Sequence, residues 1–334
     1  MVKPPLVLFL SICCGFLLSA ADEDETAPSK LTKKDFLQLL RTKQFDELDR
    51  LATRSAANMP NLRTGYALHH IIDYLQAPAP TRDGSANWTE HLDQLNAWVA
   101  HSPKSVFPRI VLGRAYVSWA WSARGTAYAD QVTKEGWELF AERLGQANTT
   151  LLEAEKVSAK RPELYSVWLT VAYALDLPQQ RTDEIFKKGR AADRDDTRLY
   201  YTRARFLLPR WYGKPGDWEK FAAQMADDRG GKEGDLLYML ILRSQASTEG
   251  DSFFENAKVS YPRMKKGFEA RLNSTSDEIG ELNSFCYFAC IAGDKSTAQS
   301  LFRRIDSKWR KSQWKNEGRF QNWKSWAEGS DASK

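Results

Sequence analysis

The sequence has 334 residues, of which 42% are hydrophobic and 27% charged, and its formal net charge is +5. This is the composition of a globular protein large enough to bury a core without metals or disulfides, and it excludes an intrinsically disordered chain. The 19 Gly and 13 Pro exclude collagen-like and low-complexity chains and favour helices, while the mild charge does not indicate a dedicated nucleic-acid binder.

Residues 1–21 have the pattern of a secretory signal peptide, with an apolar run from Leu6 to Leu18 and small residues ending at Ala21. The apolar run is shorter than the roughly 20 residues that span a bilayer, which makes a transmembrane anchor the weaker alternative. Cys13 leaves lipid attachment as a second alternative. We expect a bacterial protein exported to the periplasm or the extracellular space, with no anchor after cleavage and a disordered acidic leader over 22–30.

Helical apolar periods dominate from residue 31 to residue 327, and no segment alternates like a β-strand. The predicted helices span about 32–40, 45–52, 62–75, 88–101, 107–122, 132–159, 162–175, 182–192, 197–207, 217–226, 235–244, 261–272, 278–291, 295–305 and 309–326. Leu208–Gly216 cannot continue a helix, and Gly230–Lys232 is interpreted as a helix-breaking loop. Residues 328–334 are expected to form a disordered tail.

Traces of a repeat accompany these helices. Leu112, Gly113 and Tyr116 match the first helix of a tetratricopeptide unit, and Gly293 and Ala298 match its turn and second helix. The unequal spacing of such units indicates a degenerate array, with an irregular α-bundle as the alternative. The predicted fold is all-α: a right-handed α-α solenoid of degenerate tetratricopeptide-like hairpins in a single elongated domain over 31–327.

Four stretches carry a joint pattern: Trp119–Gly125, Leu207–Gly213, Asn283–Phe302 and Trp309–Phe320. Together they resemble the domain of unknown function family 4034, a family of mostly bacterial exported proteins. The resemblance implies coverage from about residue 31 to residue 326 and an all-helical, tetratricopeptide-like fold. It implies no activity and no catalytic residue.

The sequence has no His-Glu-x-x-His, Gly-x-Ser-x-Gly, phosphate-loop or dinucleotide-binding motif. His69 and Asp73, four residues apart on a helix, can touch one metal ion but have no third ligand in the sequence, and a surface hydrogen bond is the simpler interpretation. Cys286 and Cys290 are expected to be small buried side chains, with an oxidised pair or a metal site as alternatives. We therefore expect no catalytic residue, metal or cofactor, and a protein that is not an enzyme.

Trp121 and Arg124, and again Arg210 and Trp211, place a guanidinium beside an indole at a predicted helix end. Such a pair can stack or clasp a carboxylate, which makes these four residues candidates for a binding groove. The alternative is that both arginines bond loop carbonyls and fix the corners of the array. The predicted function is that of an exported scaffold that binds an unidentified protein or peptide on its concave face.

An alternative function is polysaccharide cleavage or carbohydrate binding, because the sequence has 12 Trp and several carboxylate pairs, although packing also explains the indoles. Arg303–Lys324 has eight Lys and Arg against two acidic residues, interleaved with Trp. We expect a solvated face there and no nucleic-acid partner, with an anionic envelope polymer or lipid as the alternative.

Overall fold

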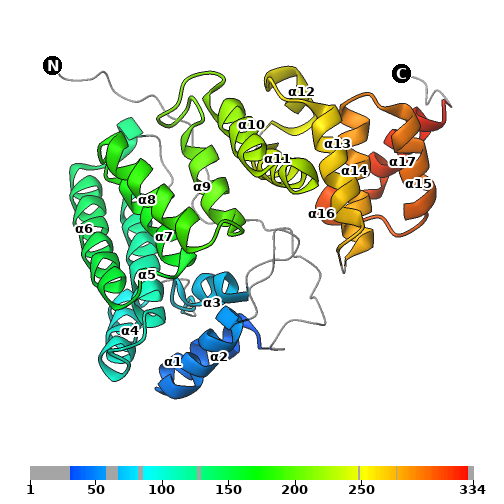
Figure 1. The fold of residues 1–334 in the computed structure, drawn as a ribbon. Helices are drawn as coiled ribbons and strands as arrows, with labels where there is room; N and C mark the ends of the chain where they lie inside the picture. Colours follow the sequence, from blue (N-terminus) through cyan, green and yellow to red (C-terminus); the bar gives the residue numbers. More distant parts are fainter. Residues whose placement is uncertain are drawn as a thin grey trace. The chain divides into compact units, whose positions relative to one another are not determined.

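The structure, a computed structural model, describes residues 31–57, 67–81, 86–125, 129–246, 249–275 and 277–329. All regular elements in these ranges are helical, apart from an isolated bridge between Pro80 and Ala86, which confirms the all-α prediction (Figure 1). The predicted signal peptide and leader lie outside the described residues, as does most of the predicted tail. No helix in the described ranges is both long and apolar enough to cross a bilayer.

The described chain divides into two compact units, one over residues 31–206 and one over residues 207–329. The first unit contains α1 Lys33–Arg41, α2 Phe45–Ala57, α3 Ala67–Leu75, α4 Trp88–His101, α5 Phe107–Arg124, η1 Ala129–Gln131, α6 Lys134–Val157, α7 Pro162–Ala174, α8 Gln179–Ala192 and α9 Thr197–Phe206. The second contains α10 Asp217–Arg229, α11 Gly231–Ala246, η2 Gly250–Ser252, α12 Phe253–Asn256, α13 Tyr261–Leu272, α14 Glu278–Ile291, α15 Lys295–Ile305, α16 Lys311–Trp314 and α17 Glu317–Glu328. The single elongated domain and its right-handed twist stay predictions.

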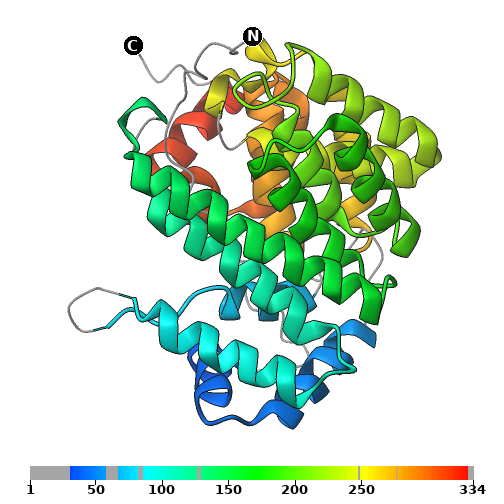
Figure 2. The ribbon, with the colours of Figure 1, turned by 90° about the vertical axis from the view of Figure 1, so that its left-hand side faces the viewer.

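The N-terminal unit alternates between two layers of helices. In one layer α3, α5, α7 and α9 contact one another in that order, and in the other α4, α6 and α8 pack against their neighbours in sequence. Figure 2 shows these helices in colours that pass from blue at α3 through cyan to green at α9. This alternation is the arrangement of stacked helical hairpins expected from the sequence.

A close contact between α5 and α6 in the predicted repeat depends on a missing side chain. A Cβ atom at Gly113 of α5 would lie 2.7 Å from Cδ2 of Leu151 on α6. Contact at this distance is far inside van der Waals separation, so glycine allows α6 to approach. Gly113 therefore lies where α5 and α6 approach closely, while the tetratricopeptide-like character of the array stays a prediction.

In the C-terminal unit successive helices pack against one another, α10 on α11, α11 on α13, α13 on α14 and α14 on α15. The prediction of a loop over Gly230–Lys232 was wrong in extent. Gly230, with φ of 74°, ends α10, and α11 begins at the next residue. The corner is tight because a Cβ at Gly234 would lie 2.2 Å from the carbonyl oxygen of Ala226. Two consecutive glycines with positive φ, Gly230 and Gly231, therefore turn the chain where a longer loop was expected.

Candidate functional site

The end of α5 and the start of α6 bring Trp121, Arg124, Trp137 and Phe140 together, and we call these four residues the Trp–Arg cluster. The guanidinium carbon of Arg124 lies 5.5 Å from the ring centre of Trp121 and 5.2 Å from that of Trp137. Phe140 meets both indoles edge-on, at centroid distances of 4.9 and 5.7 Å. Arg124 also donates a hydrogen bond of 3.3 Å to the Gly125 carbonyl, so it both stacks on rings and fixes the helix end.

The local sequence explains why these side chains meet. Helix α5 ends at Arg124 because Gly125 adopts a φ of 70°, and α6 begins after Thr133, whose side chain accepts from the backbone N–H of Gly136. Trp137 is 38% exposed, while Trp121 and Arg124 are half-buried. The cluster is thus reachable from solvent.

Arg143, further along α6, repeats this arrangement with Trp119 of α5. Its guanidinium carbon lies 3.7 Å from the Trp119 ring centre, and its Nη1 donates to the Trp119 carbonyl at 2.8 Å. Its Nε is buried and has no hydrogen-bond partner in the described chain, and burial lowers the pKa of this arginine. Sequence reasoning missed Arg143, although its spacing of three from Phe140 puts these two side chains on neighbouring positions of one helix face.

These groups define what the surface can do chemically. Indoles and guanidinium groups stack, bury apolar area and donate hydrogen bonds, and a guanidinium clasps a carboxylate. None of them transfers a proton near neutral pH. The arrangement is suited to binding.

Arg210 and Trp211 lie in the C-terminal unit, in a turn before α10. The backbone N–H groups of Trp211 and Gly213 both donate to the Leu208 carbonyl, at 2.8 and 3.3 Å. A Cβ at Gly213 would lie 1.8 Å from the Leu207 carbonyl oxygen, so only glycine fits. Burial lowers the pKa of Arg210. The motif is explained as a turn, and a binding role for Arg210 and Trp211 stays a prediction.

His69 and Asp73 do not share a ligand; each binds a different residue near the start of α9. Nε2 of His69 lies 3.1 Å from Oδ1 of Asp196, and Arg198 donates to both oxygens of Asp73 at 2.9 and 2.8 Å. Ser166 donates to Asp196 at 3.1 Å. This places aspartate between serine and histidine, so the histidine cannot activate the serine as in a hydrolytic triad. Sequence reasoning missed this network because Asp196 lies 127 residues from His69.

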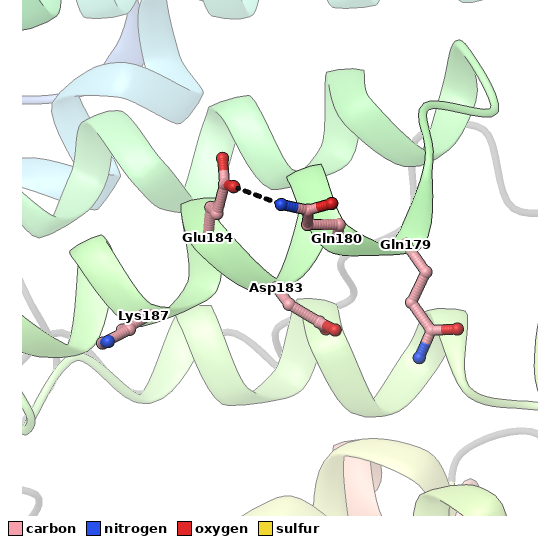
Figure 3. A pocket seen from close by; sticks show the side chains of 5 residues that line it. All are labelled: Gln179, Gln180, Asp183, Glu184 and Lys187. Atoms are coloured by element: carbon pink, nitrogen blue, oxygen red, sulfur yellow. Dashed lines mark hydrogen bonds between the residues drawn. The ribbon is translucent and has the colours of Figure 1, made fainter.

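The carboxylates of α8 line an open hollow of about 540 Å³, which Figure 3 shows from close by. Its lining residues are Gln179, Gln180, Asp183, Glu184 and Lys187. Asp183 is bound by Arg203, and Glu184 by Arg181 at 3.2 Å and Gln180 at 3.3 Å. All five lining residues come from one helix, and both acidic ones, Asp183 and Glu184, are bound by neighbouring side chains. The hollow therefore does not hold a pair of carboxyl groups arranged for acid–base catalysis.

The two described cysteines are free and buried on α14. Cys286 is 0% and Cys290 2% exposed, and burial raises the pKa of the Cys286 thiol. This agrees with their interpretation as small buried side chains. A thiol kept protonated in an apolar core is a poor nucleophile and a poor metal ligand.

Packing accounts for some tryptophans and not for others. Four are at most 5% exposed: Trp98, Trp168, Trp218 and Trp314. Packing explains these four indoles, whereas Trp137 is the most exposed indole in the described chain. The indoles available to a ligand in the N-terminal unit are therefore those at the ends of α5 and α6 and their neighbour Trp88.

Comparison with known families finds a match for most of the N-terminal unit. A family model described as Domain of unknown function (DUF4034) matches residues 32–195. The match includes Trp119–Gly125 and ends before the three other stretches on which the resemblance was based, so it covers less of the chain than expected. No curated protein matches the chain at a significant level.

Proposed function

Because residues 32–195 belong to the DUF4034 family, which assigns no activity, we propose from the geometry that this chain is an exported, non-enzymatic helical scaffold whose N-terminal unit binds a protein or peptide. The observation that carries the proposal is the Trp–Arg cluster. Trp and Arg are the side chains that contribute most to protein interfaces, and here they lie together and reachable at one end of a helical hairpin.

The cluster favours a peptide over a sugar. Sugar rings need the flat face of an indole, and the Arg124 guanidinium stacks on Trp121 and Trp137. A peptide side chain or carboxylate can instead use the indole edges and the planar, hydrogen-bonding edge of the guanidinium. Glycan binding is therefore the outcome that the proposal excludes.

Site-specific photo-crosslinking tests the proposal in the source cell. A photoreactive amino acid replaces exposed Ala141, which lies one turn from Trp137 on α6, and separately replaces Leu152 on the same helix as a control. Leu152 is 37% exposed, nearly the same as Trp137 at 38%. We expect a discrete protein or peptide adduct from position 141 and none from position 152.

The adduct at 141 should disappear in an Arg124→Ala, Trp137→Ala double variant that keeps the helical circular dichroism of the wild type. It should also decrease when excess unlabelled wild-type chain competes. Identical adducts from both positions, or binding of glycans that depends on Trp137, would contradict the proposal.

Export is the second part of the proposal and has its own test. The mature protein is expected in the cell envelope or the medium, beginning at Asp22. Mass spectrometry of its N-terminal peptide checks this, and a cytoplasmic chain that retains residues 1–21 would refute it.

A further inference from the structure

Positive charge is concentrated in one part of the C-terminal unit. Residues 295–326 contain nine Lys and Arg against two acidic residues, whereas the whole chain contains 48 against 43, so the rest of the chain is slightly acidic. The highest density is in residues 303–315, which we call the basic segment, with six Lys and Arg and one Asp. The segment includes the end of α15, the loop after it, and α16.

Most of this charge is not neutralised within the protein. Arg304 pairs with Glu278 at 2.6 Å, and Arg310 approaches Asp277 at 3.6 Å. The other four basic residues are exposed and make no ion pair in the described part of the chain: Arg303, Lys308, Lys311 and Lys315. Four unneutralised cations within 13 residues repel one another, and an external anion relieves that repulsion.

The basic segment is held in one shape by a buried amide. Oδ1 of Asn283 on α14 accepts from the backbone N–H of Arg310 at 3.0 Å and from Nε1 of Trp314 at 2.8 Å. Its Nδ2 donates to the Lys308 carbonyl at 3.1 Å. Trp314 is fully buried and anchors the segment to the core of the C-terminal unit. The lysines are therefore presented from a fixed backbone.

An indole lies among these cations. Trp309, between Lys308 and Arg310, is half-buried and stacks on Phe320 at a centroid distance of 6.4 Å. A partly exposed Trp beside Lys and Arg is typical of the interfacial zone of a bilayer, where an amphipathic ring sits at headgroup level and basic side chains meet phosphate.

We propose that the basic segment docks the C-terminal unit onto an anionic phospholipid bilayer. Each Lys or Arg close to such a surface strengthens binding roughly fivefold, so four cations make a measurable site. A nucleic-acid strand is less well matched. It needs a row of free aromatic faces, whereas Trp314 is buried and Phe320 covers one face of Trp309. The proposal does not depend on the partner proposed for the N-terminal unit.

Co-sedimentation of the purified chain with vesicles tests the proposal. We expect binding to vesicles of phosphatidylcholine mixed with phosphatidylglycerol, little binding to phosphatidylcholine alone, and weaker binding as salt is raised. The test variant changes Lys308, Lys311 and Lys315 to Glu. The matched control changes three other exposed lysines of the same unit, Lys220, Lys232 and Lys258, to Glu.

Both triple variants change the net charge of the chain equally. If only the long-range attraction between the whole chain and the vesicle mattered, the two variants would lose the same affinity. We expect the test variant to lose affinity by at least ~100-fold and the control to lose far less. Trp309→Ala should weaken the binding that remains at high salt, where insertion of the ring matters more than charge. Equal losses in the two triple variants, or tighter binding to a single-stranded oligonucleotide than to the anionic vesicles, would overturn the proposal.

Discussion

The substitution Asp196→Asn replaces a buried carboxylate that connects α3, α7 and α9 of the N-terminal unit. The Asp196 carboxylate is 0% exposed and accepts from Nε2 of His69 at 3.1 Å, Oγ of Ser166 at 3.1 Å and the backbone N–H of Arg198 at 2.9 Å. An amide keeps the shape and loses the charge. The NH2 group that replaces one carboxylate oxygen is a hydrogen-bond donor, and it faces other donors.

The expected cost follows from these contacts. Hydrogen bonds to a charged group contribute about 1.5–3 kcal/mol each, and a buried donor left without an acceptor costs about 1–3 kcal/mol. Since the amide oxygen still accepts from one or two donors, we expect Asp196→Asn to lower the free energy of unfolding by about 2–4 kcal/mol at pH 7. Urea unfolding followed by circular dichroism measures this loss.

The control is Asp46→Asn, which removes the partner of His101 in an exposed pair of the same unit. The Asp46 side chain is 94% exposed, so its loss should change stability by less than about 1 kcal/mol. Asp196→Asn at wild-type stability, or Asp46→Asn as costly as Asp196→Asn, would refute this account of the network.

The same carboxylate predicts a pH dependence. Burial alone would raise the pKa of Asp196, but the nearby His69 and Arg198 and the hydrogen bonds from His69 and Ser166 together outweigh this effect and hold the pKa below its ordinary value. A carboxyl with a lowered folded-state pKa stabilises the protein above its unfolded pKa of about 4, and this stability is lost as pH falls through the folded pKa. The wild type should therefore lose stability more steeply below about pH 4 than Asp196→Asn does. Parallel acid profiles would contradict the sign.

Four further outcomes are expected. Gly267→Ala should destabilise the C-terminal unit by about 1–3 kcal/mol in thermal unfolding, because its Cβ would lie 2.4 Å from a backbone oxygen of α11. Gly145→Ala on the exposed face of α6, where nothing lies within 4 Å, should instead stabilise the N-terminal unit by about 0.5–1 kcal/mol. Asn283→Leu should cost about 2–4 kcal/mol by the same assay, since it removes the acceptor of two buried or half-buried donors. Cys286 and Cys290 should react with a thiol reagent only after denaturant unfolds the C-terminal unit, and fast labelling of the native chain would contradict their burial.

Helix positions were largely predictable because each helix carries its own signals. The predicted ranges 88–101, 261–272, 278–291 and 295–305 match α4, α13, α14 and α15. Each of these helices has a side-chain N-cap, as with Asn87 before α4 and Asp294 before α15, followed by an apolar period. Local chemistry fixes such boundaries.

Errors occurred where tertiary contacts decide. The helix expected over 309–326 is broken by Lys315, a non-glycine residue with φ of 67°, into α16 and α17. Trp314 drives this break, because burying its ring and bonding Asn283 stabilise the segment more than helix continuity would. Burial of this kind depends on residues far away in the sequence.

The binding candidates show the same division. Trp121 and Arg124 were predicted from adjacency on α5, but Trp137, which completes the cluster, comes from the next helix. The apolar residues around Trp137 in the sequence do not indicate that this indole is exposed. Arg210 and Trp211 were predicted from their adjacency in the sequence. The structure shows that their stretch forms a tight turn, in which only glycine fits at position 213.

The boundary between the two units falls between Phe206, the last residue of α9, and Leu207. The family match ends within the first unit, so a gene segment that stops at codon 206 encodes the complete family match and interrupts no helix. A chain divided at this point keeps every described helix of both units whole.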